Sequence, residues 1–376
     1  MVKLLVDAHT FDETHQGIRS FLKGIYSAID FTEEEVEVIL AANDIENLKK
    51  EFKDQKSFKY VKLKSKNKYI RLAYEIPKLI RHHKIDFAHF NYFLPLFLSK
   101  RCKYIVTIHD VLFIDFPEFF PLKYRIINGF MYRRSAHKSS ILTTVSRYSA
   151  ERIRECFKTD DKTIHVIPNS VGEYYFEDRD KEADRDYMKA KYGLGNYMLY
   201  VSRIEPRKNH AMILKIFMEQ KLWEQDMKMV FIGNESLESK ELTELMAQIK
   251  DHSADSVAIF ENVSNEELVK FYNAARLSVF LSYCEGFGIP PLESGVLKTP
   301  TLCSRATAMM DFDFFEEYLV DPDDKDQIKN KTLEILDNPD SVELKRRMVE
   351  IADAIKERYN WKKSAKKFKN SLLDKV

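Results

Sequence analysis

The chain alternates short apolar runs with longer stretches of helical periodicity, and no other feature restricts its fold as strongly. We expect strands at 3–7, 35–41, 87–90, 104–110, 139–146, 163–169, 197–203, 228–233, 257–263, 277–282, 299–304 and 318–322. Helical patterns lie between them, for example at 18–29, 69–82, 122–137 and 147–157. Because the strand runs are almost continuously apolar, the alternation predicts parallel sheets that helices cover on both faces.

Length and one polar stretch indicate two domains. The 376 residues exceed one ordinary domain, and 44% of them are hydrophobic, enough to bury two cores. The stretch 177–196 is dense in charge and ends in turn residues, so we expect the linker near it. We therefore predict an α/β fold with two doubly wound, Rossmann-like domains, 1–175 and 195–357, that face a central cleft. Ligands of such sheets bind beyond the carboxyl ends of strands, so residues at these ends are the candidates for function.

Charge, cysteine usage and hydropathy exclude several classes of protein. The net charge of +1 does not favour nucleic-acid binding. Four widely spaced cysteines, with no CxxC and no metal-ligand spacing, indicate free thiols in a reducing compartment. The start of the chain lacks the features of a signal peptide, and no run approaches the roughly 20 apolar residues of a spanning helix. We therefore expect a cytoplasmic protein that at most contacts the inner membrane face peripherally.

One segment departs from this balance of charge. Between Lys49 and Lys84 the chain has thirteen Lys or Arg residues against three acidic ones, a local charge of +10. One interpretation is a solvated face with a flexible loop. The other is a patch that contacts anionic lipid head groups or an acidic acceptor. The segment itself leaves both interpretations open.

The string SYCEGFGIPPLESG at 282–295 joins an expected buried strand to an expected helix through a glycine loop. Glycines at 286 and 288 allow backbone N–H groups to approach a ligand closely, and a helix N-terminus favours phosphate. Glu293, in the first helical turn, can accept hydrogen bonds from a ribose diol. Glu285, at the strand end, can bind sugar hydroxyls or stabilise positive charge at an anomeric carbon. The structural alternative is a glycine turn and an acidic helix start that bind nothing.

A second string, YVSRIEPRKNH at 200–210, begins as a strand and breaks at Pro206. Arg203 and Lys208 therefore lie on a loop at a strand end. Two cations there, without a metal-binding motif, can neutralise a leaving diphosphate. The alternative is a set of ordinary surface residues, which suits Arg207 better than the other two.

His109 and Asp110 end the apolar run of TIHDVLFIDFPEFFP at 107–121. An imidazole beside a carboxylate at a strand end suggests acid–base chemistry, and a buried, hydrogen-bonded histidine is the alternative. Gly17 lies between the first strand and the helix that follows, where a tight turn explains a glycine equally well. Ser264 or Asn265 is expected to cap the helix that follows the strand at 257–263.

These strings resemble the retaining glycosyltransferases of family four, which have the GT-B fold. EGFGIPPLE is similar to the E-x7-E signature of this family, and YVSRIEPRKNH is similar to its G-R-x-x-x-x-K-N motif, with Ser202 where glycine is usual. VSRYSAERI and IPNSV resemble further family stretches. The resemblance covers most of the chain, most strongly 197–300 and next 104–170. It thins in SRATAMMDFDFFEEY, where Asp311 stands in the place of a glutamate and the usual proline is missing.

The resemblance implies a role for each matching residue. Glu285 would contact the donor sugar and Glu293 the ribose, and His109 would lie at the donor sugar. Further substrate contacts are implied for Gly17, Asp110, Val263, Gly286, Phe287, Gly288 and Ile289. The Gly-Phe-Gly amides would meet the donor phosphates, the Gly17 loop would cover them, and the backbone of Val263 would lie beside the nucleobase. A closing helix at about 360–376 would cross back onto the first domain.

The implied activity is metal-independent, retaining transfer of a hexose, with His109, Glu285, Arg203 and Lys208 as the catalytic set and no cofactor. The donor would be a nucleotide diphosphate sugar on the second domain, with GDP-mannose preferred by resemblance to mannosyltransferase-like members. The acceptor, a glycan or lipid-linked glycan of surface polysaccharide biosynthesis, would bind the first domain. Two alternatives stay open: another GT-B enzyme such as a sugar-nucleotide epimerase, and a nucleotide-sugar-binding protein without turnover. A Rossmann dehydrogenase is disfavoured, because no GxGxxG follows the first strand.

Overall fold

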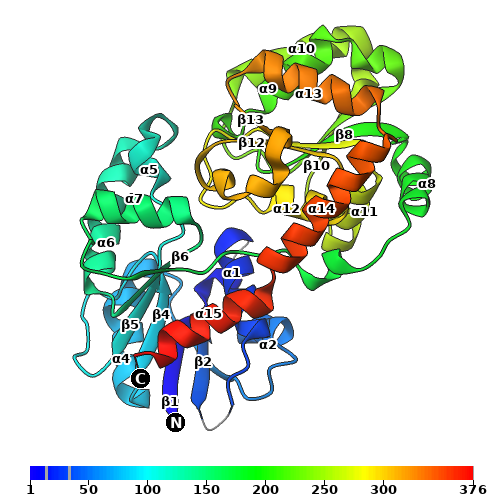
Figure 1. The fold of residues 1–376 in the computed structure, drawn as a ribbon. Coiled ribbons are helices and arrows are strands. Elements are labelled where there is room, and N and C mark those ends of the chain that lie inside the picture. Colours follow the sequence, from blue (N-terminus) through cyan, green and yellow to red (C-terminus); the bar gives the residue numbers. More distant parts are fainter. Residues whose placement is uncertain (13–15, 33–34, 376) are drawn as a thin grey trace. The chain divides into compact units, whose positions relative to one another are not determined.

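The computed structural model describes residues 1–12, 16–32 and 35–375, and the chain forms two compact units. Unit 1 comprises Met1–Ser170 and Tyr359–Val376, and unit 2 comprises Val171–Arg358. Each unit is built on one sheet of parallel strands with helices on both faces (Figure 1). The predicted fold class, two α/β units with doubly wound parallel sheets, is confirmed.

The sheet of unit 1 has seven strands in the order β3-β2-β1-β4-β5-β6-β7. Their bounds are β1 Val2–Asp7, β2 Val36–Ala42, β3 Lys59–Lys62, β4 Phe87–Asn91, β5 Lys103–Thr107, β6 Ile141–Thr144 and β7 Ile164–Val166. The sequence does not predict β3, because its KYVK run holds two lysines; as an edge strand it leaves both of them exposed. The direction of winding reverses between β1 and β4, which pair with each other in the sheet.

Helices cover both faces of this sheet (Figure 1). Their bounds are α1 Gln16–Ala28, α2 Ile45–Glu51, α3 Lys68–Ile70, a π-helical turn Arg71–Glu75, α4 Ile76–His83, α5 Leu112–Asp115, α6 Leu122–Lys138, α7 Arg147–Phe157 and α15 Trp361–Leu373. The helix predicted at 69–82 is thus in three pieces. On one face, Ile80 of α4 and Tyr132 of α6 belong to the same buried cluster as the strands. On the other face, the ring of Tyr26 on α1 lies 5.8 Å from that of Phe368 on α15.

The tail helix α15 belongs to unit 1 although it follows unit 2 in the sequence. Asn360 caps its start by accepting a hydrogen bond from the Lys363 N–H. Trp361 then lies over Gly24 of α1, where any β-carbon would come within 2.1 Å of the indole. Close packing of an aromatic ring on a glycine therefore attaches the end of the chain to the first unit.

The sheet of unit 2 has six strands in the order β10-β9-β8-β11-β12-β13. Their bounds are β8 Asn196–Val201, β9 Met227–Ile232, β10 Val257–Phe260, β11 Leu277–Phe280, β12 Thr301–Ser304 and β13 Leu319–Val320. The helices are α8 Lys181–Tyr192, α9 His210–Glu219, α10 Lys240–Ser253, α11 Asn265–Ala274, α12 Pro290–Val296, α13 Lys325–Asp337 and α14 Val342–Arg358. Here the direction of winding reverses between β8 and β11, which pair directly.

The charge-dense stretch at 177–196 is not the linker that the sequence suggests. Most of it is α8, which Asp180 caps by accepting hydrogen bonds from the N–H groups of Glu182 and Ala183. Its buried face holds Met188 and Asp184, and Asp184 accepts a hydrogen bond of 2.8 Å from Asn273 on α11. The helix belongs to unit 2, which begins at residue 171 rather than at 195. Its many charges mark a solvated helix face.

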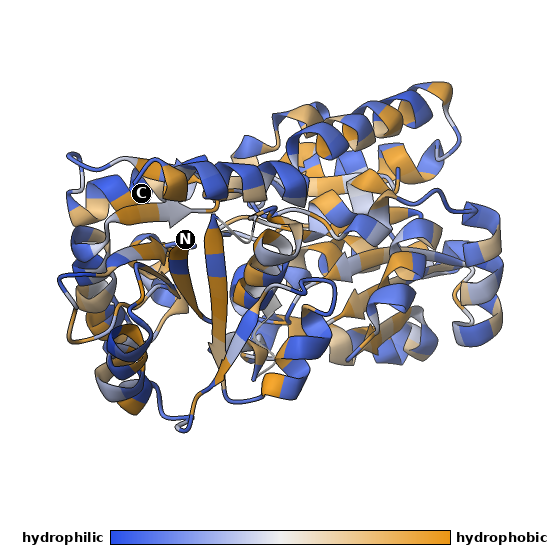
Figure 2. Cartoon of the chain, turned by 90° about the horizontal axis from the view of Figure 1, so that it is seen from below, coloured by the Kyte–Doolittle hydropathy of each residue, from blue (hydrophilic) through white to orange (hydrophobic). Residues whose placement is uncertain are grey.

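Hydropathy follows this layering. Figure 2 shows strands that are mostly hydrophobic and helices that carry both hydrophobic and hydrophilic stripes.

The four cysteines are free, as expected. Within 1–12, 16–32 and 35–375, no helix combines the length and the apolar character needed to cross a membrane.

Candidate functional site

The two strings that resemble family motifs lie side by side in unit 2. The loop after β8 carries residues 202–209, and the loop after β11 carries residues 281–289. Since β8 and β11 are adjacent parallel strands, both loops leave the same edge of the sheet. This edge is also where the winding reverses, and ligands of doubly wound sheets bind in such a place.

A buried cluster of charges connects the two loops. Lys208 Nζ contacts Glu285 Oε1, and Arg207 Nη1 lies 3.4 Å from Glu285 Oε2. Arg207 Nη2 also lies 2.6 Å from Glu205 Oε1. The side chains of these four residues are at most 13% exposed. The cluster therefore brings together two of the predicted catalytic residues, Lys208 and Glu285.

Glu285 is ionised in this environment. Burial raises the pKa of its carboxyl, but the charges of Lys208 and Arg207 outweigh burial and lower the pKa to about 2. An anionic carboxylate at this edge can accept hydrogen bonds from sugar hydroxyls. It can also stabilise positive charge at a reacting carbon.

The two arginines of this loop differ in exposure in a way that the sequence does not suggest. Arg207, expected at the surface, is buried, donates a hydrogen bond of 2.8 Å to the Cys284 carbonyl and pairs with Glu285. The side chain of Arg203 is 63% exposed, and its Nη2 lies 3.9 Å from Glu205 Oε1. The cause is Pro206, which begins a short 3-10 turn, Pro206–Lys208, that directs Arg207 and Lys208 to the β11 loop. Arg207 is therefore the cation that the sequence analysis missed.

Glu293, the second acid of the E-x7-E signature, lies in a different environment. It occupies the first turn of α12, and the hydroxyl of Tyr272 donates a hydrogen bond of 2.9 Å to its Oε2. Burial raises the pKa of Glu293 to about 7, although the hydrogen bond from Tyr272 opposes the shift. The two acids of the signature are therefore separated in pKa, and a hydroxyl that donates to Glu293 would favour its ionised form.

The glycine loop is shaped by one residue in particular. Gly288 has φ of +93°, a conformation that L side chains rarely adopt, and a β-carbon there would meet Met309 at 3.0 Å. The Phe287 side chain is buried, with its ring 5.6 Å from that of Phe312. Ile289 is half-buried and precedes α12. Phe287 can thus reach a ligand through its backbone only.

The start of α12 does not supply the phosphate-binding N–H groups that the sequence suggests. Pro290 and Pro291 have no N–H, and the N–H groups of Leu292 and Glu293 both donate to the Ile289 carbonyl. A phosphate on this loop would therefore depend on the amides of residues 286–289 and on nearby cations.

A 3-10 turn at Thr307–Asp311 supports the Glu285 backbone, and no sequence signal indicates this contact. The Glu285 N–H donates a hydrogen bond of 2.8 Å to Thr307 Oγ1. Ala308 N–H lies 3.4 Å from the Glu285 carbonyl oxygen. This turn falls in the stretch where the family resemblance thins, so no motif could have identified it.

Close backbone approach between neighbouring loops explains another glycine. Gly233 follows β9 with φ of +144°, and a β-carbon there would lie 1.9 Å from the Ser202 carbonyl oxygen. Ser202, which stands where glycine is usual, contacts His210 Nε2 at 3.1 Å through its hydroxyl. The serine hydroxyl thus has a hydrogen-bond partner, and Gly233 leaves room for the Ser202 carbonyl.

Val263 lies in the turn between the edge strand β10 and α11 and is half-buried. Ser264 caps α11 by accepting a hydrogen bond from the Glu267 N–H, which confirms the first of the two predicted caps. The contact of Val263 with a nucleobase stays a prediction.

His109 in unit 1 is buried behind the end of β5. Its Nε2 forms a hydrogen bond of 2.9 Å with Asn91 Oδ1, and its ring lies 5.2 Å from that of Phe21. Burial lowers the pKa of His109 to about 3, so the imidazole is neutral near pH 7. The burial and the hydrogen bond to Asn91 favour the alternative of a buried, hydrogen-bonded histidine over the acid–base interpretation. Asp110 beside it accepts a hydrogen bond from the Leu112 N–H.

Gly17 lies in the first turn of α1, and a β-carbon at this position would meet no described residue within 4 Å beyond its chain neighbours and its own helix backbone. Arg19, two residues further on, pairs with Glu51 at 2.7 Å. The part of the expected phosphate-covering loop at 13–15 lies outside the described residues.

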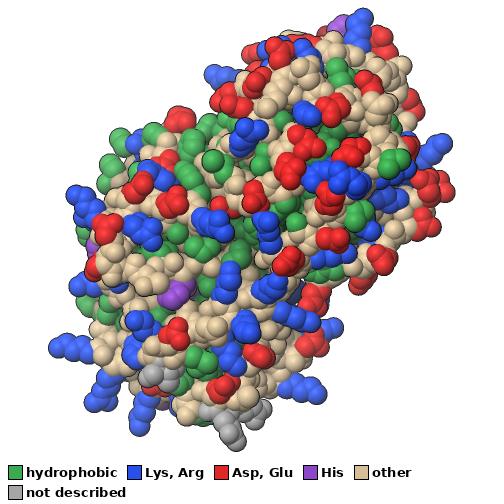
Figure 3. Space-filling model, in the orientation of Figure 1, with side chains coloured by type: hydrophobic (Ala, Val, Ile, Leu, Met, Phe, Trp, Pro, Cys, Tyr) green, Lys and Arg blue, Asp and Glu red, His purple; other side chains and the backbone are tan. Residues whose placement is uncertain are grey.

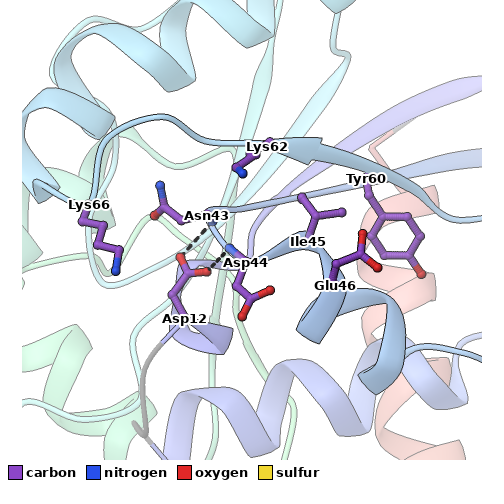
Figure 4. Close-up of a pocket in the computed structure, with 8 residues that line it drawn as sticks. All are labelled: Asp12, Asn43, Asp44, Ile45, Glu46, Tyr60, Lys62 and Lys66. Atoms are coloured by element: carbon purple, nitrogen blue, oxygen red, sulfur yellow. Dashed lines mark hydrogen bonds between the residues drawn. The ribbon is translucent and has the colours of Figure 1, made fainter.

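A pocket opens in unit 1 beyond the carboxyl ends of β2 and β3 (Figure 4). Its lining is mostly polar: Asp12, Asn43, Asp44, Ile45, Glu46, Tyr60, Lys62 and Lys66. Asp12 accepts hydrogen bonds of 2.9 and 2.6 Å from the N–H groups of Asn43 and Asp44, which fixes this wall of the pocket. No sequence pattern indicates this pocket, because its residues come from four separate segments without a motif.

Comparison with known families agrees with this geometry. Residues 184–355 match the model of the glycosyl transferases group 1, and residues 30–172 match that of glycosyltransferase family 4. The chain belongs to the family 4 glycosyltransferases. The predicted family is confirmed, and the Glu285 and Lys208 loops both lie inside the first match.

Relatives and solved structures support the same family. This glycosyltransferase is 27% identical over 244 residues to the O-antigen chain mannosyltransferase RfbU of Salmonella typhimurium. The matched region covers 63% of this chain and 62% of that protein. It is 26% identical over 251 residues to O-antigen chain mannosyltransferase B of Escherichia coli, with 65% and 64% covered. The matches thus span less than two thirds of these relatives.

Among solved structures, Anabaena HepE in complex with UDP and glucose has a TM-score of 0.71 at 15% identity, with 99% of both chains covered. A glycosyltransferase from Rickettsia africae has a TM-score of 0.70 at 15% identity, with 98% of this chain and 97% of that chain covered. These structures share the fold of this glycosyltransferase.

Proposed function

We propose that this glycosyltransferase moves a hexosyl group, with retention of configuration, from a nucleotide diphosphate sugar to a glycan or lipid-linked glycan. The observation that carries the proposal is the buried cluster of Glu285, Lys208 and Arg207 at the edge where β8 and β11 end. It supplies one fixed carboxylate and two fixed cations where a doubly wound sheet binds ligands.

We assign the donor to unit 2. Lys208 and the exposed Arg203 would neutralise the leaving diphosphate, and Arg207 would hold Glu285 in position. Glu285 would bind hydroxyls of the donor sugar and stabilise charge at the anomeric carbon. Glu293 would accept the ribose hydroxyls. Protein cations would thereby take the place of a metal ion, so the reaction is proposed to be metal-independent.

We assign the acceptor to unit 1. The pocket that Figure 4 shows offers carboxylates, an amide, a tyrosine and two lysines, which are groups that bind sugar hydroxyls. His109, as a neutral imidazole, would act through a hydrogen bond to the donor sugar rather than through proton exchange. The acceptor hydroxyl would attack the anomeric carbon on the face that the diphosphate leaves, which retains the configuration.

GDP-mannose is the proposed donor, and synthesis of a surface polysaccharide is the proposed process. The relatives named as O-antigen mannosyltransferases support both, while the UDP complex of Anabaena HepE keeps a uridine donor as the competing choice. A lipid-linked acceptor would place the enzyme in the cytoplasm at the inner membrane face, in contact through the basic segment 49–84.

A thermal-shift screen tests the donor assignment. The protein is heated with GDP, UDP, dTDP or ADP, and then with the corresponding sugars, and stabilisation by one nucleotide follows from mass action. A raised Tm with GDP and GDP-mannose is the expected result, and stabilisation by another nucleotide would replace the proposed donor. Release of nucleotide on addition of a glycan acceptor supports transfer. A new nucleotide sugar formed without such release identifies an epimerase, and binding without either product identifies a binding protein.

A further inference from the structure

Unit 1 exposes a group of large apolar side chains that its core does not use. They lie on three segments: α3 with the π-helical turn, the loop after β4, and α6. We call them the apolar face: Tyr69, Ile70, Tyr74, Leu96, Phe97, Ile127 and Phe130. Their exposed fractions range from 44% to 71%. Monomeric proteins rarely expose a connected group of this kind without an interaction partner.

Hydrogen bonds hold the three segments together. The Leu96 N–H donates to the Leu72 carbonyl at 3.2 Å, which joins the loop to the π-helical turn. Arg134 of α6 donates to the carbonyls of Pro95 and Leu96 at 3.0 and 2.9 Å. Ile127 and Phe130 precede Arg134 by seven and four residues, so they lie on the same stripe of α6 as this arginine. The segments that carry the apolar face are therefore held next to one another.

The core of unit 1 uses a different side of α6. Tyr132 and Ala136 of the same helix belong to the core cluster of unit 1. By contrast, α15 covers its solvated side with Lys362, Lys363, Lys366 and Lys367, all exposed. A helix of this unit can thus have a charged outer side, and α6 has an apolar one instead.

Basic residues surround the apolar face. The ranges 66–74, 93–101 and 122–134 contain three, two and four Lys or Arg residues, and none of them contains Asp or Glu. Arg71 of the first range is buried and lies 3.4 Å from Asp7, so it does not belong to this basic surround. Elsewhere in the basic segment 49–84, two lysines pair with acids: Lys49 with Glu46 and Lys59 with Glu37. Figure 3 shows hydrophobic side chains beside Lys and Arg over the part of unit 1 that carries α5 and α6. Cations without an acidic residue in the same stretch of chain therefore accompany the exposed apolar groups.

We propose that the apolar face and its surrounding Lys and Arg residues dock on the surface of an anionic lipid bilayer. Apolar side chains would enter the head-group boundary, and the cations would contact lipid phosphates. The docking rests on the proposed function, because it would bring the enzyme to a lipid-linked acceptor. The membrane contact is thereby assigned to residues 66–74, 93–101 and 122–134. Lys66 belongs to the first of these ranges and also lines the pocket of unit 1, so a lipid-linked acceptor held at this face would lie near that pocket.

Sedimentation with lipid vesicles tests the docking. The full chain is mixed with vesicles of phosphatidylcholine alone or of phosphatidylcholine with phosphatidylglycerol. We expect binding to the anionic vesicles only. The paired changes Leu96→Ser with Phe97→Ser, and Ile127→Ser with Phe130→Ser, should each weaken binding at least about tenfold, because two apolar groups no longer enter the lipid. The matched control, Leu237→Ser with Val342→Ser, changes two exposed apolar residues of unit 2 and should bind within about twofold of the original protein.

A second comparison separates this face from general attraction to a basic segment. Lys100→Gln with Lys123→Gln removes two charges beside the apolar face and should weaken binding several-fold. Lys53→Gln with Lys56→Gln removes two charges from the same protein away from the face and should have little effect. Equal losses in both pairs would overturn the assignment, as would unchanged binding in both serine pairs.

Two further outcomes would also overturn the proposal. The first is a failure of the original protein to bind anionic vesicles even at low salt. The second is a dimer in solution that Ile127→Ser with Phe130→Ser converts to a monomer without loss of vesicle binding, which would assign the face to a second copy. Nucleotide thermal shifts are measured on every variant. Vesicle binding without any nucleotide-induced shift would contradict the proposed function and leave the docking intact.

Discussion

Lys208 and Glu285 form a buried ion pair although 77 residues separate them in the sequence. The pair connects the loops of two adjacent strands, β8 and β11, and Arg207 approaches the same carboxylate from its other oxygen. A buried pair of charges gains little over a well-packed apolar core, so its presence is not explained by stability alone. Its partners are the residues proposed to contact the donor.

Breaking this pair is expected to affect both stability and activity. Lys208→Met or Glu285→Gln leaves the remaining charge buried without its partner and should lower the free energy of unfolding by about 3–5 kcal/mol. The double variant should lose less than the sum of the two. Urea unfolding of the three variants gives the coupling energy, and strictly additive losses would contradict the contact. Each single variant should also lower kcat at least about a hundredfold, measured below its own Tm.

The pKa of Glu285 predicts a loss of stability in acid. Its folded value of about 2 lies below the reference of 4.5, so the stabilisation is present above pH 4.5 and is lost as the pH falls toward 2. The full difference corresponds to about 3 kcal/mol. The difference in unfolding free energy between the original protein and Glu285→Gln should therefore shrink as the pH falls from 5 to 2.5. A constant difference would mean that the carboxylate is not paired.

The sequence predicts the elements of the fold and the members of the site better than it predicts their environment. The apolar runs determine the strands, and the glycines and prolines determine the loops that carry Glu285 and Lys208. Exposure is different, because it depends on which strand lies next to which. Only the pairing of β8 with β11 shows that Arg207 is buried and Arg203 is not.

Supporting contacts are equally hidden from the sequence. Thr307 accepts a hydrogen bond from the Glu285 N–H, and Tyr272 donates a hydrogen bond to Glu293. Neither Thr307 nor Tyr272 belongs to a motif. The pocket of unit 1 likewise collects side chains from separate segments. The charged stretch at 177–196, near which the linker was expected, shows a related limit: a charged composition does not distinguish a linker from a helix with one buried face.

Nucleotide binding is expected to release a proton from Glu293. Its folded pKa of about 7 exceeds the reference of 4.5, so its contribution to stability is present below pH 4.5 and is lost as the pH rises through 7. Ribose hydroxyls would donate to the carboxylate and lower this pKa, which releases a fraction of a proton near pH 6.5. Calorimetry in two buffers of different ionisation enthalpy measures this release. Glu293→Gln should release none, and proton uptake by the original protein would contradict the ribose contact.

Gly288 and Gly17 should respond differently to alanine. Gly288→Ala places a side chain at φ of +93° and against Met309, so it should lower the stability by about 1–3 kcal/mol and weaken donor binding. Gly17→Ala lies in a helix and meets no described residue within 4 Å outside that helix, so its Tm should be unchanged or slightly higher. Tm and the KM for the donor distinguish the two. A raised KM in Gly17→Ala with an unchanged Tm would support the predicted phosphate contact of this loop, and an unchanged KM would remove Gly17 from the site.

Arg203 and Arg207 offer a comparison between two cations of one loop. The Arg203 side chain is 63% exposed, so Arg203→Ala should leave the Tm within about 1 °C, because exposed charges contribute little to stability. Its effect should appear in catalysis, as a lower kcat and weaker inhibition by free nucleotide diphosphate, if the guanidinium meets the leaving group. Arg207→Ala removes a hydrogen bond to the Cys284 carbonyl and contacts with two buried carboxylates, so it should lower the Tm clearly as well as the activity.

Substituting lysine for Arg203 or Arg207 keeps the positive charge but removes the planar guanidinium, so it shows which of the two properties each position requires. Arg203→Lys should recover much of the activity, since one exposed cation can replace another near a diphosphate. Arg207→Lys should recover little, because a single ammonium cannot reach Glu205, Glu285 and the Cys284 carbonyl together as the planar guanidinium does. Equal recovery at both positions would mean that Arg207 acts as a simple charge. Full activity in Arg203→Ala would transfer the diphosphate contact from Arg203 to Lys208 alone.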